Sequence, residues 1–154
     1  MKTLRQHIDE SLKIGKNLSE WSSYSCQPKT RSELKEIIKT RIKEQEPECD
    51  LNDIDVSQIT DMYDLFYNSD FTGDISKWDV SNVTKMSSMF FLSKFNGDLS
   101  KWDVSSVTDM RWMFQNSKFN GDISQWNINK NCNTWFMFKD CPIKEEYKPK
   151  ALQS

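Results

Sequence analysis

The sequence predicts an α/β repeat fold, a short solenoid of about three and a half coils behind a helical N-terminal cap. One motif of 24 residues recurs at a fixed step from Trp78 to Trp102 to Trp126. A related copy begins at Ile54, and the last copy decays after Pro142. Fixed self-similarity of this length is typical of stacked-repeat proteins, in which each unit buries its apolar side against its neighbours.

The 154-residue chain therefore divides into three parts. Residues 1–48 form the predicted cap, residues 49–142 the repeats, and residues 143–154 a fraying C-terminal tail. In the cap, the spacing of apolar residues favours one helix over residues 3–20 and a second over residues 31–45.

The second helix has a start signal and an apolar stripe. Thr30 and Glu33 form a capping-box pattern, in which hydroxyl and carboxylate satisfy each other's free amides. Leu34, Ile37 and Ile38 follow on one face. We expect this face to cover the open end of the first repeat, and docking of a partner helix is the alternative.

Within each repeat the pattern predicts a short strand and a short helix. Trp78 and Val80 alternate with polar residues, as inward-facing strand positions do. Met86, Met89 and Phe90 are spaced like one face of a helix. The expected columns of stacked side chains are Ile54/Trp78/Trp102/Trp126, Val56/Val80/Val104/Ile128, Met62/Met86/Met110 and Phe66/Phe90/Phe114/Phe138.

Aspartates recur directly after the glycines of the repeats, at Asp74, Asp98 and Asp122. We expect their side chains to bond to turn amides. Calcium is the alternative, since Gly-x-Asp repeats occur in calcium-bound β-rolls, but the nonapeptide spacing and double glycines are absent. We therefore predict no metal and no cofactor.

Charge and composition exclude several classes of function. Residues 49–142 carry 8 Lys/Arg against 13 Asp/Glu, a net −5, which argues against nucleic-acid binding. No apolar run could span a bilayer, and the N-terminal stretch lacks the apolar core of a secretory signal, so we expect a cytoplasmic protein that does not bind membranes.

Catalytic and metal-binding patterns are missing from the sequence. The four cysteines have no C-x-x-C spacing and His7 is the single histidine, which argues against zinc. Pairing of Cys132 with Cys141 stays open. Since there is no nucleophile elbow and no phosphate loop, we expect the protein not to be an enzyme.

The repeat WDVSNVTKMSSMFFLSKFNGDLS, which begins at Trp78, resembles the BspA-like leucine-rich-repeat family, a domain of unknown function common in Mycoplasma and gut bacteria. The segment ELKEIIKTRIKEQEPECDLNDIDVSQITDM is similar to the entry of such domains. The resemblance covers residues 49–142. It implies a right-handed leucine-rich-repeat-like solenoid used for protein contact, often at cell surfaces.

One candidate binding site is the row of polar residues that point out between the inward strand positions. Like charges stacked across neighbouring strands need an offset. The lysines of the row could pair diagonally with its aspartates, or the row could meet a basic surface of a protein partner. The candidate residues, which we call the outer row, are Asp55, Lys77, Asp79, Lys101, Asp103 and Asn127.

The second candidate is Trp112, which aligns with Ser88 and Asp64 of the earlier repeats. An exposed tryptophan at this position would be an interface anchor. The alternative is that Trp112 packs against Phe136 of the next repeat.

These observations favour a protein–protein interaction module that binds a bacterial protein. A narrower hypothesis is an inhibitor, encoded by a phage or mobile element, of a host defence protein with a basic groove. The alternative is a surface or adhesion-type structural module with no inhibitory role. Exposed edges at the ends of a short stack also suggest self-association.

Overall fold

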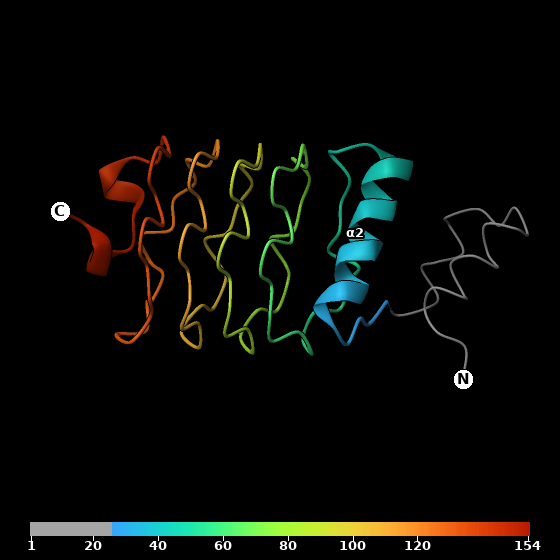
Figure 1. Ribbon diagram of the computed structural model, residues 1–154, viewed down its shortest axis with the longest axis horizontal. Helices are drawn as coiled ribbons and strands as arrows, with labels where there is room; N and C mark the ends of the chain where they lie inside the picture. Colours follow the sequence, from blue (N-terminus) through green and yellow to red (C-terminus); the bar gives the residue numbers. More distant parts are fainter. Residues whose placement is uncertain (1–25) are drawn as a thin grey trace, which may run out of the picture.

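The computed structural model describes residues 26–154. Its main helix, α2, spans Arg31–Gln45 and confirms the second predicted helix. The helix predicted over residues 3–20 lies outside the described residues. After α2 the chain forms a stack of turn-rich layers, and two short 3-10 helices, η2 (Glu145–Tyr147) and η3 (Lys150–Leu152), lie at the far end (Figure 1).

The side chains of Thr30 and Glu33 each accept a hydrogen bond from a backbone amide at the start of α2. The Glu33 amide donates to the Thr30 hydroxyl oxygen (3.2 Å), as predicted. The Glu33 carboxylate accepts from the Lys29 amide (2.8 Å) and not from that of Thr30, so this half of the predicted capping box is wrong. The carboxylate still satisfies a free amide, one residue earlier in the chain.

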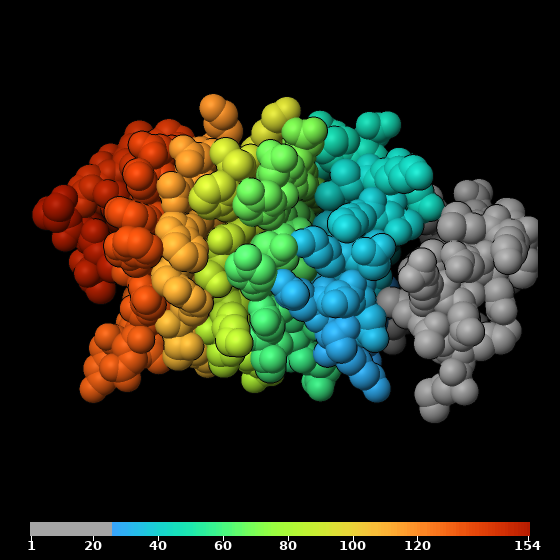
Figure 2. Space-filling model, viewed as in Figure 1, coloured from blue at the N-terminus to red at the C-terminus, as the bar shows by residue number. Residues whose placement is uncertain are grey.

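Helix α2 packs against the first layer of the stack (Figure 2). Its apolar face joins the common core, and ion pairs fix its polar face. Lys35 pairs with Asp64 (2.7 Å), and Arg41 pairs with Asp53. The buried residues of α2 are Leu34, Ile37, Ile38 and Arg41.

The predicted α/β leucine-rich-repeat-like solenoid is wrong. Over residues 26–154, α2 is the one α-helix, and single-residue parallel bridges take the place of strands. Four of the five bridges join residues 24 apart, so each repeat forms one turn-rich layer on the next. The bridges are Cys26–Ile54, Asp50–Asp74, Asp61–Lys85, Lys85–Asp109 and Asp109–Asn133. We number the layers one to four, as residues 54–77, 78–101, 102–125 and 126–142.

The short helix predicted in each repeat does not form, because its amides bond in two directions. Every second amide from Met86 to Leu92 donates to a carbonyl of the next layer, at 2.8–3.1 Å. The amides of Met89, Phe91 and Ser93 close turns within their own layer, at 3.1–3.2 Å. An α-helix would direct all of these amides back along its own chain. The equivalent segments, which we call the turn segments, are residues 62–68, 86–92, 110–116 and 134–140.

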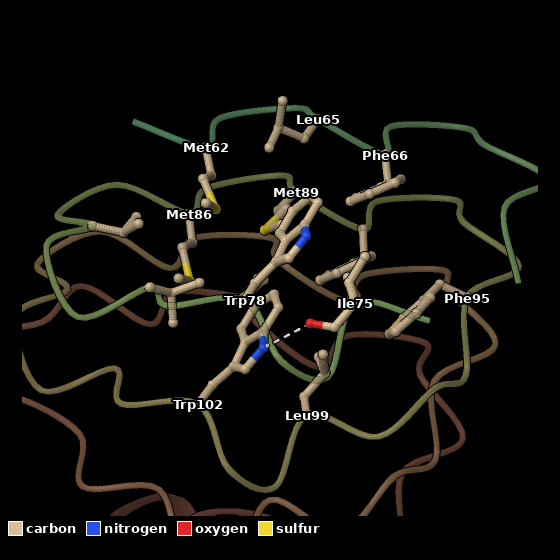
Figure 3. Packing of buried hydrophobic residues seen from close by; sticks show 14 of the residues in the cluster. Met62, Leu65, Phe66, Ile75, Trp78, Met86, Met89, Phe95, Leu99 and Trp102 are labelled. Atoms are coloured by element: carbon tan, nitrogen blue, oxygen red, sulfur yellow. Dashed lines mark hydrogen bonds between the residues drawn. The ribbon is translucent and has the colours of Figure 1, made fainter. Parts of the chain in front are cut away.

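The tryptophan column also joins layers without a strand ladder. Trp78 and Val80 are buried while Asp79 is exposed, so the predicted inward and outward alternation is confirmed. The Trp102 indole N–H donates to the Ile75 carbonyl oxygen, 27 residues earlier in the chain (3.2 Å; Figure 3). The equivalent indole bonds run from Trp78 to the Leu51 carbonyl (2.8 Å) and from Trp126 to the Leu99 carbonyl (2.9 Å).

Aromatic columns form the centre of the core. The Phe90 ring stacks on Phe66 and on Phe114, with 5.4 Å between centroids in each pair. Trp78 stacks on Trp102 at 6.4 Å. The predicted stacking of equivalent aromatic residues is confirmed, although the backbone that holds them is built from turns.

The C-terminal residues dock onto the fourth layer, so the predicted fraying tail is wrong. Ile143 and Pro149 are buried, and Leu152 packs against the core. The Tyr147 carbonyl accepts a hydrogen bond from the Ile123 amide (3.0 Å). These residues cover part of the last layer, much as α2 covers the first.

Candidate functional site

The outer row occupies equivalent positions of successive layers, beside the buried tryptophan column. Asp79 and Asp103 are exposed, and Asp55 is half-buried because the Gln27 amide donates to its carboxylate (2.5 Å). Asn127 is exposed at the same position of the fourth layer. The stack therefore brings the predicted polar residues together on its surface.

The aspartates of the outer row also shape the backbone. One carboxylate oxygen of Asp103 accepts from both the Ser105 hydroxyl (2.7 Å) and the Ser105 amide (3.0 Å). Asp79 and Ser81 make the same pair of bonds. The hydrogen bonds from Ser105 hold the pKa of Asp103 below its ordinary value. A substitution here changes a turn as well as a surface charge.

The lysines of the outer row do not offset these aspartates as predicted. Over the part of the chain that the structure describes, neither Lys77 nor Lys101 forms an ion pair. The predicted diagonal pairs are therefore wrong. Local hydrogen bonds from serine stabilise the stacked carboxylates instead.

Trp112 is half-buried in the third layer and contacts the fourth. Its ring lies 5.7 Å from that of Trp135, and the Arg111 guanidinium lies over it at 5.2 Å. Trp112 thus contacts Trp135 in place of the predicted packing on Phe136. Phe136 in turn stacks on Trp135, with 4.3 Å between the ring centroids. We call Trp112, Trp135 and Phe136 the aromatic cluster.

The most exposed members of this cluster were missing from the predicted binding residues. Trp135 is 57% exposed and Phe136 is 43% exposed. The sequence carries a signal for both. Phe136 aligns with Trp112, Ser88 and Asp64 of the earlier repeats, and Trp135 aligns with Arg111, Ser87 and Tyr63. The fourth repeat is therefore the one repeat with aromatic residues at both of these turn positions.

All large apolar side chains that the structure shows as exposed lie on turn segments. Tyr63, Tyr67 and Leu92 precede the aromatic cluster along the stack. Tyr67 stacks on Phe91 of the next layer at 5.4 Å. The turn segments therefore present a discontinuous apolar surface, which is largest in the fourth layer.

The described residues offer little reactive chemistry. They contain no group of three or more His, Cys, Asp or Glu side chains that could hold a metal. All four cysteines are free thiols, and burial raises the pKa of Cys132 to about 11 and raises that of Cys141. Both thiols are therefore protonated at neutral pH and weak as nucleophiles. No described helix could serve as a membrane span, since none is both long and apolar enough.

Comparison with known proteins places the repeats in a family. A family model described as "Mycoplasma protein of unknown function, DUF285" matches residues 33–148. The chain belongs to this family. The DUF285 match begins inside α2 and ends just after η2, so it includes parts of both ends that cover the layers. No curated protein and no solved structure matches the chain.

Proposed function

We propose that this DUF285 protein is a protein-recognition module that binds its partner through the aromatic cluster. The observation that carries the proposal is the exposure of Trp135 (57%) and Phe136 (43%) beside half-buried Trp112. Adjoining aromatic side chains at a surface are typical of protein interfaces, because a partner that covers them removes a large apolar area from water. The second layer carries serine at both of these positions, Ser87 and Ser88, so stacking alone does not require aromatic residues there.

In this proposal the charge of the outer row makes the protein prefer a partner of opposite charge. Asp79 and Asp103 each use one carboxylate oxygen for a turn and leave the second toward solvent. Residues 49–142 carry a net −5, which favours a partner with a basic surface opposite the row.

The resemblance of the repeats to BspA-like proteins, which use them for protein contact, supports the same function. Four free cysteines fit a reducing compartment, and we place the proposed activity in the cytoplasm on that ground. An inhibitor of a bacterial protein is the narrower form of the proposal. A surface module without inhibitory role is the alternative.

Site-specific photo-crosslinking in bacterial cells tests the proposal. A benzophenone amino acid replaces Trp135 in one variant and Lys118, which is exposed on the third layer, in the control. We expect one protein to be joined at position 135 and not at position 118. The purified partner should then bind the wild type stoichiometrically.

Two further variants locate the contact. Trp135→Ser combined with Phe136→Ser should abolish binding of that partner. Asp79→Asn combined with Asp103→Asn removes charge but keeps the turns, and should weaken binding by a smaller factor. Equal crosslinking at positions 135 and 118, or full binding by the serine variant, would contradict the proposal.

A further inference from the structure

Hydrogen bonds between turn segments run in one direction along the whole stack. In each inner layer, alternate amides donate to alternate carbonyls of the layer that follows. Between the third and fourth layers these bonds measure 2.8–3.1 Å. The donors of this set are the amides of Met110, Trp112, Phe114 and Asn116, and the acceptors are the carbonyls of Asn133, Trp135, Met137 and Lys139.

The fourth layer has the equivalent amide donors, but no further layer follows it to supply carbonyl acceptors. Over residues 26–154, no group accepts a hydrogen bond from the amides of Thr134, Phe136, Phe138 or Asp140. None of these four residues is buried. Since a backbone amide needs an acceptor, these four form an open edge of aligned donors, which we call the open edge.

Helix α2 covers the opposite end of the stack (Figure 1). The carbonyl of Tyr63, which is equivalent to an acceptor in every later layer, accepts a hydrogen bond from the Arg31 guanidinium of α2 (3.2 Å). A second copy could not place its first layer on the open edge without displacing α2. Two open edges that face each other would oppose donors to donors. Self-association is therefore disfavoured at this edge.

Two lysines lie over aromatic rings of the open edge, and one of them, Lys148, is paired with Glu145 (2.5 Å). Lys139 lies over the Phe136 ring at 4.9 Å, and Lys148 lies over the Phe138 ring at 5.9 Å. Residues 123–154 carry five lysines against three acidic residues, whereas residues 49–76 carry seven aspartates and no Lys or Arg. The two ends of the stack thus differ in sign, and the donor-rich end is the basic one.

We propose that the open edge binds an extended acidic segment of a protein partner. An extended peptide presents carbonyl oxygens along one edge at every second residue, which suits alternate amide donors. Its carboxylates would lie near Lys139, and its apolar side chains would contact Phe136. The inference rests on the proposed recognition function and names the chemistry of the partner segment.

The experiment is a titration of isotope-labelled full-length protein, followed by amide chemical shifts in NMR spectra. The probe is a short acetylated peptide of alternating glutamate and valine, and its counterpart carries lysine in place of glutamate. Free glutamate at equal carboxylate concentration is the third arm. We expect the acidic peptide alone to shift the four amides of the open edge, with saturation.

Charge variants provide the matched control. Lys139→Glu should weaken binding of the acidic peptide by about tenfold or more. Lys118→Glu makes the same charge change away from the edge and should leave affinity within about twofold.

Several outcomes would overturn the inference. These are equal shifts with free glutamate, equal affinity for the lysine peptide, shifts confined to other layers, or shifts at the open edge that follow protein concentration without peptide. If the peptide fails while crosslinking at position 135 still identifies a partner, the acidic-segment inference falls and the recognition function stands. If only the crosslinking fails, the proposed recognition function is wrong, and the peptide titration by itself decides the acidic-segment inference.

Discussion

Each indole in the tryptophan column has two functions, because its ring fills the core and its N–H bridges two layers. Trp102 is 4% exposed and donates to the Ile75 carbonyl, which also accepts from the Trp78 amide. Leucine or phenylalanine could fill much of the same space but could not make the bridge. Ile54 occupies the equivalent position of the first layer.

The bridge predicts graded costs for substitution of Trp102. Trp102→Phe should lower the free energy of unfolding by about 1–2 kcal/mol, because one hydrogen bond and part of the ring are lost while the Ile75 carbonyl keeps a donor. Trp102→Ala should cost about 3–5 kcal/mol through its cavity. Urea denaturation measures both, and a phenylalanine variant as stable as wild type would show that the indole bond contributes nothing.

The turn segments depend on left-handed backbone at fixed positions. Asn68, Leu92, Asn116 and Asp140 are equivalent residues with φ between 49° and 57°. Asparagine and aspartate tolerate this region, whereas leucine does so at a steric cost. Leu92 is 43% exposed, so little packing offsets its strain.

Reciprocal exchange at this column should therefore change stability in opposite directions. Leu92→Asn should raise the free energy of unfolding by about 0.5–1 kcal/mol, and Asn116→Leu should lower it by a similar amount. Thermal melts of the two variants and wild type provide the comparison. Shifts of the same sign would mean that surface contacts, and not backbone strain, decide stability here.

Across the whole molecule, aspartates at equivalent corners repeat one hydrogen-bonded turn. Asp74, Asp98 and Asp122 accept from the amides of the serines two residues later, at 2.8–2.9 Å, as predicted. These bonds from Ser76, Ser100 and Ser124 hold the pKa of each carboxyl below its ordinary value of 3.8. The contributions repeat in three successive layers, so they should add along the stack.

This repetition predicts a pH dependence of stability. Because the folded-state pKa values are lowered, the stabilisation is fully present above pH 3.8 and is lost as pH falls below it. The melting temperature should therefore drop steeply below this pH. Asp74→Asn, Asp98→Asn and Asp122→Asn together keep the turns without a titrating group and should flatten the drop. An unchanged slope in this triple variant would assign the acid sensitivity to other groups.

The sequence by itself determined the repeat length, the buried columns, the corner aspartates and the helix over residues 31–45. These features follow from side-chain type and spacing, because burial and capping depend on local residue patterns that recur in each repeat. It also placed the outer row on the surface and marked Trp112 as unusual. It did not identify the exposed pair of Trp135 and Phe136 as candidate binding residues.

Only the tertiary structure decided the backbone of each layer and the two ends of the stack. The spacing of Met86, Met89 and Phe90 suits a helix, but alternate amides bond to the next layer, and that layer lies 23 residues away in the chain. Local propensity cannot anticipate such non-local bonds. The docked tail and the open edge depend on the same cause, because a backbone donor is satisfied or left free according to which segment lies beside it.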